Sequence, residues 1–103
     1  MSNRLEQLTK LHQADPADAF LSYGIALEHG KAGRFDDAIS WLNKTLELDP
    51  NYCYAFFQKA RMYIEKGDDQ TARQVLNTGL EAARQTGDAH AHSEIQELLA
   101  SLE

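Results

Sequence analysis

The stretch GRFDDAISWLNKTLELDPN, residues 33 to 51, contains the unit from which the fold of this chain can be predicted. It begins with a glycine and continues with apolar residues spaced by three and four. It ends at Asp49 and Pro50, where proline cannot extend the hydrogen-bond ladder of a helix. The stretch therefore predicts one amphipathic helix over residues 35–48, and the next question is whether the unit recurs.

The same helical spacing of apolar residues runs through the whole chain, whereas the strict alternation typical of β-strands is scarce. The sequence therefore predicts an all-α protein of about six helices joined by short turns, including a turn at 31–34. Prolines, glycines and a cap at Asp88 mark where the expected helices begin and end. The six helices are expected at 3–14, from 16 or 17 to 29 or 30, and at 35–48, 52–66, 69–85 and 88–102.

An internal repeat becomes visible when the chain is shifted by 34 residues against itself. The identities are Ala26 with Ala60, Gly33 with Gly67, Ala38 with Ala72, Leu42 with Leu76, Asn43 with Asn77, Leu46 with Leu80, and Glu47 with Glu81. Two aromatic pairs also align, Phe20 with Tyr54 and Tyr23 with Phe57. The unit is therefore present about two and a half times, because the first copy contains only its second helix.

A helix-turn-helix period of this length resembles the tetratricopeptide repeat. The first full copy carries the pattern at Ser22, Ile25, Ala26, His29, Ala38, Leu42 and Pro50, and the second at Phe56, Lys59, Ala60, Tyr63, Ala72 and Leu76. Ser22 and His29 depart from the pattern in the first copy, and Lys59 and Arg84 in the second. The resemblance covers roughly residues 4–85 and implies antiparallel helix pairs stacked into a superhelix. We expect the alanines to lie where paired helices approach most closely.

The length of 103 residues indicates a single domain, 1–103. Within it we expect an N-terminal half-repeat helix at 1–16, a first repeat at 17–50, a second repeat at 51–85 and a C-terminal capping helix at 86–103. The segment from Gln85 onward contains no Lys or Arg, which is typical of the polar outer surface that a terminal unit of a stack needs.

The charge balance bears on the choice of partner. Sixteen acids and ten scattered bases give a formal net charge of −6, which disfavours nucleic acid. No apolar run resembles a secretion signal or a membrane span, so we expect no membrane partner. The only cysteine, Cys53, excludes an internal disulfide and is compatible with a cytoplasmic location.

No catalytic, cofactor or metal site is predicted. The segment GIALEHGKAGR lacks the spacing and the preceding strand of a phosphate-binding loop. His90 and His92 are two apart and point to different sides of a helix, unlike zinc ligands. Cys53 aligns with Ala19, which predicts a small buried residue rather than a nucleophile. The chain is therefore not expected to be an enzyme.

A stripe of side chains on the first helix of each repeat is the predicted binding surface. Phe20, Tyr23 and Leu27 recur one repeat later as Tyr54, Phe57 and Arg61, and Gln58 lies beside them. The resemblance implies that these helices line a concave groove that receives extended or helical peptides. We expect a protein or peptide partner with apolar or aromatic anchors, and Arg61, Gln58 and Lys31 selecting acidic or polar neighbours.

The residues of this surface differ from those of a known carboxylate-binding subtype and leave an alternative open. One tetratricopeptide subtype binds the terminal carboxylate of chaperone peptides through Lys, Asn and Arg, but the matching places here carry Tyr23, Leu27 and Gln58 and do not support that clamp. The alternative to a peptide groove is that the aromatic residues belong to the core and are covered by the first or last helix or by a second chain. Exposed leucines of the first helix, among Leu5, Leu8 and Leu11, would favour a homodimer.

Overall fold

The computed structural model describes residues 3–103, and this part of the chain forms six α-helices and no strand. The helices are α1 Asn3–Ala14, α2 Ala19–Lys31, α3 Phe35–Leu48, α4 Cys53–Glu65, α5 Asp69–Thr86 and α6 Ala89–Ser101. The all-α prediction is confirmed.

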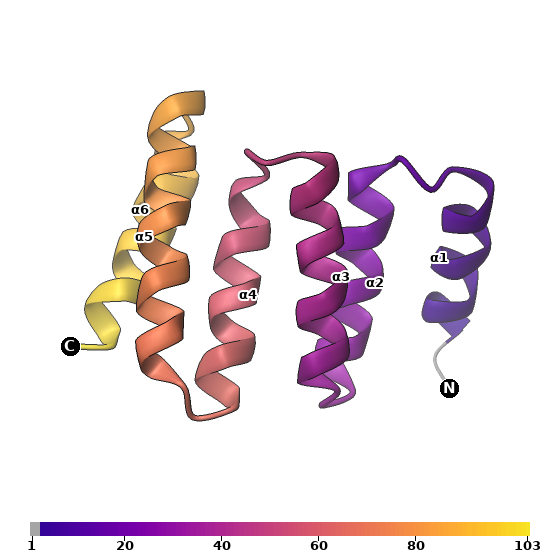
Figure 1. Cartoon of the computed structure of the whole chain (residues 1–103), viewed down its shortest axis with the longest axis horizontal. Helices are drawn as coiled ribbons and strands as arrows, with labels where there is room; N and C mark the ends of the chain where they lie inside the picture. The colour runs from indigo at the N-terminus through magenta and orange to yellow at the C-terminus, as the bar shows by residue number, and fades with distance from the viewer. Residues whose placement is uncertain (1–2) are drawn as a thin grey trace.

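The helices follow one another along the long axis of the molecule, with α1 and α6 at opposite ends (Figure 1). Helix α2 packs against α3 and α4 packs against α5, while the pairs are joined through α3 and α4. Helices α1 and α6 pack against α2 and α5 at the two ends of the stack. With extents of 38 × 29 × 18 Å, the molecule is an elongated stack of antiparallel helix pairs.

The ends of the helices follow from local chemistry, and one predicted start was wrong. The carboxylate of Asp18 accepts a hydrogen bond from the backbone N–H of Phe20 at 2.9 Å, so Asp18 is the N-cap and α2 begins at Ala19 rather than at 16 or 17. Lys31, expected in the following turn, is the last residue of α2. The Asp88 cap is confirmed, because its carboxylate accepts a hydrogen bond from the backbone N–H of Ala91.

Two glycines one repeat apart make the turns within the pairs possible. Gly33 and Gly67 have φ values of 78° and 82°, in the left-handed region that costs other residues energy. Each glycine ends the first helix of its pair and allows the second to run back antiparallel. The repeat that was visible in the sequence is therefore also a repeat of backbone conformation.

The alanines of the repeat are buried in the clusters between helices. Ala26, Ala38, Ala60 and Ala72 are between 0% and 1% exposed, and they pack beside the fully buried leucines at 42 and 76. A larger side chain at any of them would separate the paired helices.

Ser22 stands where the family pattern has a large residue, and the structure gives a reason why the core tolerates it. Its Oγ lies 2.8 Å from the Oγ1 of Thr45 on α3, and both side chains are fully buried. Each hydroxyl also lies 2.9 Å from a carbonyl of its own helix, that of Ala19 or of Trp41. A hydrogen-bonded pair of hydroxyls thus occupies this position of the first repeat.

The N-terminal helix covers the first repeat only in part. Leu5 and Leu8 are buried against Ile25, and Arg4 and Glu28 form an ion pair of 3.7 Å between α1 and α2. Leu11, however, is 54% exposed. Of the three leucines predicted for one side of this helix, two therefore belong to the core and one faces solvent.

Candidate functional site: a groove along α2, α4 and α6

The first helices of the pairs share one side of the stack. Helix α4 contacts both α2 and α6, although these helices are far apart in the sequence. In the view of Figure 1, α3 and α5 lie in front of α2 and α6. The surface along α2, α4 and α6, here called the groove, contains two hollows, one on each side of α4.

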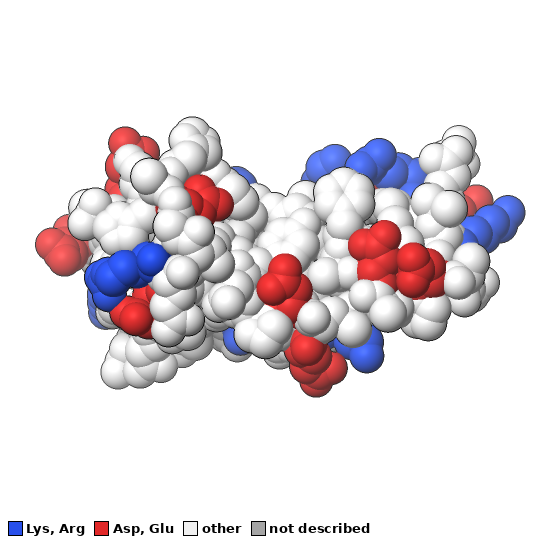
Figure 2. All heavy atoms as spheres, turned by 90° about the horizontal axis from the view of Figure 1, so that it is seen from above, with Lys and Arg blue, Asp and Glu red and all other residues white. Residues whose placement is uncertain are grey.

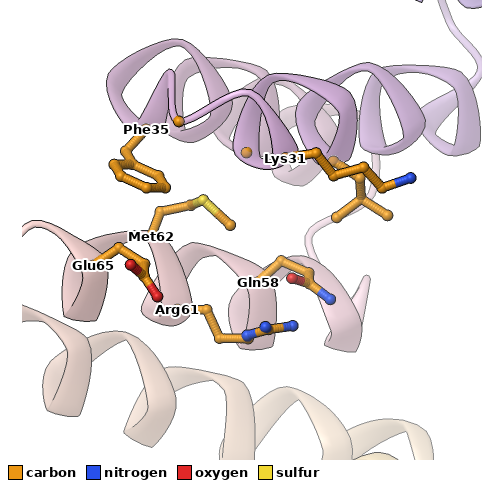
Figure 3. A pocket seen from close by; sticks show the side chains of 9 residues that line it. Lys31, Phe35, Gln58, Arg61, Met62 and Glu65 are labelled. Atoms are coloured by element: carbon orange, nitrogen blue, oxygen red, sulfur yellow. The ribbon is translucent and has the colours of Figure 1, made fainter. Parts of the chain in front are cut away.

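The first hollow lies between α2 and α4 and has a volume of about 510 Å³. Its lining residues are Leu27, Gly30, Lys31, Gly33, Phe35, Gln58, Arg61, Met62 and Glu65. Figure 3 shows the ends of Lys31, Gln58 and Arg61 directed toward the same side of this hollow, whereas Phe35 and Met62 lie toward the other side, near Glu65. One end of the hollow therefore offers hydrogen-bond donors, and the other end offers apolar surface beside the carboxylate of Glu65.

The second hollow lies between α4 and α6 and has a volume of about 440 Å³. Phe57 lines it from α4, and Glu94, Glu97, Leu98 and Ser101 line it from α6. The imidazole Nε2 of His90 lies 2.9 Å from a carboxylate oxygen of Glu94. This hollow therefore has an apolar floor beside two carboxylates.

Arg61 and Phe57 separate the two hollows. The guanidinium carbon of Arg61 lies 6.0 Å from the centre of the Phe57 ring, within the range of a cation–π contact. Arg61 is exposed and forms no ion pair with any residue in the described part of the chain. Its charge is therefore available at the edge of the first hollow.

The two tyrosines of the predicted stripe contact residues next to the hollows. Tyr23 stacks on Tyr52, with ring centres 4.9 Å apart, and burial raises the pKa of its hydroxyl while a polar contact with Gln58 opposes that rise. Tyr54 lies 6.4 Å from Phe57 and 6.5 Å from His90 between ring centres. Partial burial raises the pKa of the Tyr54 hydroxyl, and the carboxylate of Glu94 raises it further.

The seven predicted site residues therefore divide into three groups. Leu27, Gln58 and Arg61 line the first hollow, and Phe57 lines the second. Tyr23 and Tyr54 pack beside them. Phe20 is 62% exposed and lines neither hollow.

Helical periodicity places Phe35 and Met62 in helices but does not indicate that they line a hollow. Glu94 and Glu97 belong to the segment predicted as a polar cap, and they also line the second hollow. The signal that could have revealed them is the position of α6 as the next first helix in the stack.

The face of the molecule seen from above in Figure 2 carries both acidic and basic side chains among uncharged surface. Among residues 3–103, no group of three or more His, Cys, Asp or Glu side chains is arranged to hold a metal ion. Cys53 is buried, in agreement with its prediction as a small core residue. None of the described helices is both long and apolar enough to cross a bilayer.

Comparison with known proteins agrees with this architecture. Two tetratricopeptide repeat family models match the chain, one over residues 30–102 and the other over residues 2–53. Among curated proteins, the chain is similar to a Protein SGT1 homolog from Oryza sativa subsp. japonica, with 34% identity over 84 residues. That match covers 82% of this chain and 22% of the rice protein, so the chain spans about a fifth of the length of that relative.

Solved structures of similar fold cover almost the whole chain. A protein from Bordetella parapertussis has a TM-score of 0.86 at 27% identity, over 99% of this chain and 89% of that one. A tetratricopeptide repeat protein from Salinibacter ruber has a TM-score of 0.80 at 28% identity, over 86% of this chain and 90% of that one. The TPR2B domain of yeast Sti1, solved in complex with pHsp70, has a TM-score of 0.89 at 24% identity, over 95% of this chain and 78% of that one.

Proposed function

Because the chain belongs to the tetratricopeptide repeat family, we propose that the groove along α2, α4 and α6 binds a peptide segment of a protein partner. In this role the chain is a non-catalytic interaction module. The partner supplies an extended or helical segment that lies across α4 and places side chains into the hollows on either side of it.

The observation that carries this proposal is the composition of the first hollow. A volume of about 510 Å³ is within the range of ligand pockets, and the apolar side chains of Leu27, Phe35 and Met62 line it together with a few polar groups. Such a hollow accepts an apolar side chain and fixes its orientation through the donors of Gln58 and Arg61.

Proteins of the same fold are found in complexes of this general kind. The yeast Sti1 domain was solved with pHsp70, and PcrH was solved with the chaperone binding region of PopD. These neighbours are 24% and 16% identical to this chain and support the fold only, so the identity of the partner does not follow from them. The formal net charge of −6 further favours a protein partner over nucleic acid.

Photo-crosslinking tests the proposal in the cell of origin. A benzoyl-phenylalanine placed at Gln58 reports what lies in the groove, and the same residue placed at Lys44 on α3 reports what lies on another exposed surface. We expect Gln58 to capture a discrete partner segment, identified by mass spectrometry, and Lys44 to capture none.

The outcome that contradicts the proposal is equally specific. If the segment is captured from Lys44 and not from Gln58, the partner binds elsewhere on the molecule. If Gln58 captures only a second copy of this chain, the groove is a dimer contact.

A self-associating subunit is the second candidate, and two exposed apolar side chains favour it. Leu11 and Phe20 are 54% and 62% exposed, and both belong to the N-terminal part of the chain. Light scattering after size exclusion measures the association, and Leu11→Lys together with Phe20→Lys should convert a dimer to a monomer. A wild-type monomer at high concentration excludes this candidate.

A further inference from the structure

We propose that the groove selects a segment of defined charge order, with an acidic side chain at the first hollow and a basic side chain at the second. The inference rests on the proposed function and specifies the partner of the same groove. The partner is a peptide that carries an apolar residue next to the acidic one.

The first hollow has one end suited to a carboxylate. The ends of Lys31, Gln58 and Arg61 lie toward the same side of this hollow (Figure 3). Lys31 also binds Glu28 at 3.0 Å, so Arg61 supplies the charge that no described residue neutralises. Glu65 lies at the opposite end, beside Met62, where an apolar side chain of the partner is expected. A planar guanidinium next to an amide is a geometry that a carboxylate accepts well.

The second hollow has the opposite preference. Glu94 and Glu97 line it from α6, and Glu97 has no ion pair within residues 3–103. The floor formed by Phe57 and Leu98 is apolar, so a lysine or arginine could bury its aliphatic stem there and place its charge near the carboxylates. The acids and the floor together match a long basic side chain better than a short polar one.

The distance across α4 sets the spacing of the two charges. An α-helix with its side chains is about 10 Å across, and an extended chain advances about 3.3 Å per residue. An acidic and a basic residue about three positions apart therefore reach the two hollows at the same time. The order of the charges also fixes the direction in which the segment crosses the groove.

Selection from a phage-displayed random peptide library tests the inference without a known partner. We expect enriched sequences to carry an acid and a base about three residues apart, in one order only, with an apolar residue next to the acid. A synthetic peptide of the enriched sequence is then titrated by fluorescence anisotropy. Glu97→Lys should weaken its binding about tenfold, because it replaces an attraction by a repulsion.

Charge reversal on both sides separates the two subsites. Replacing the base of the peptide by an acid should restore its binding to Glu97→Lys, and replacing the acid by a base should restore its binding to Arg61→Glu. The matched controls are Glu47→Lys and Lys44→Glu, an exposed pair on α3 with the same charge changes, and neither should alter the affinity.

Three results would overturn the inference. Enriched peptides without charged residues, or with both charge orders equally frequent, would remove the charge preference while leaving peptide binding intact. If Glu47→Lys and Lys44→Glu changed the affinity for the peptide as much as Glu97→Lys and Arg61→Glu, only the net charge of the protein would matter. No enriched sequence at all would count against the proposed function itself, and the inference would fail with it.

Discussion

Gly79 in the middle of α5 offers the sharpest test of how closely the helices of this stack approach one another. It is buried, and a Cβ atom added to it would lie 2.8 Å from the Cβ of Phe56 on α4. The same atom would lie 3.3 Å from the Cδ1 of Ile95 on α6. Gly79→Ala therefore inserts one methyl group where three helices meet.

The expected cost follows from the geometry of that contact. Carbon atoms pack at about 3.5–4.0 Å, so the added methyl overlaps Phe56 by roughly 1 Å. The Cβ of Phe56 is fixed to its backbone and cannot rotate away, so α4 and α5 must move apart. Such overpacking costs about 1–3 kcal/mol, and the upper part of that range, about 2–3 kcal/mol, applies here because the contacting Cβ atoms cannot rotate away. Alanine offsets about 1 kcal/mol of this cost because it favours a helix over glycine. We expect a net loss of about 1–2 kcal/mol in the free energy of unfolding.

Gly30→Ala is the matched control. Its added Cβ would lie 3.0 Å from the Cε and 3.1 Å from the Sδ of Met62, which are the far end of a flexible side chain. Because Met62 can move aside, the helix gain should prevail and the protein should become slightly more stable. The same chemical change should thus have opposite signs at Gly79 and Gly30.

Urea unfolding followed by circular dichroism measures both variants. Gly79→Ala should also lower the melting temperature by roughly 5–15 °C, since a domain of this size loses about 4–8 °C per kcal/mol. If Gly79→Ala is as stable as the wild type while Gly30→Ala is destabilised, the helix spacing deduced from these contacts is wrong.

The other predictions concern single side chains and are tested by the same unfolding measurement. Ser22→Ala and Thr45→Val should each lower the free energy of unfolding by about 1 kcal/mol. The double variant should lower it by less than the sum, because the two hydroxyls form a hydrogen bond with each other, and an additive loss would refute this. Gly33→Ala should cost about 1 kcal/mol through its φ of 78° alone, since no atom lies within 4 Å of the added Cβ; an unchanged stability would contradict it. Burial, followed by the nearby Tyr23, raises the pKa of Tyr52 to about 12. The neutral Tyr52 ring therefore stabilises the fold fully below about pH 10, and this contribution is lost as the pH rises toward 12. Between about pH 10 and 12, the free energy of unfolding of Tyr52→Phe should fall less than that of the wild type. If the two proteins lose stability in parallel with pH, ionisation of Tyr52 does not cause the loss.

Most of the fold could be predicted from residues that act locally. The glycines at 33 and 67 and Pro50 set the turns, and the alanines at 26 and 60 predicted the close helix contacts. The predicted start of α2 was wrong by two or three residues, because the carboxylate of Asp18 caps the N–H of Phe20 and the helix begins after it, at Ala19. The division into repeats with fixed boundaries stays a prediction.

The site could be predicted only in part, for a physical reason. Leu27, Gln58 and Arg61 share the first hollow because α2 and α4 are equivalent helices one repeat apart. Phe20 has the same periodic spacing, yet it lines neither hollow, because it lies in the first turn of α2. Periodicity identifies the face of a helix, but it does not determine how far along that face the neighbouring helix reaches.

The stack of helix pairs and the aromatic and polar side chains of its first helices follow from the sequence, because helical period and the 34-residue repeat can be seen in the order of the residues. The lining of the first hollow by Phe35 and Met62, and of the second by Phe57 together with Glu94 of α6, depends on the tertiary structure. These residues meet because three separate helices are brought side by side, and that arrangement depends on packing across the whole stack.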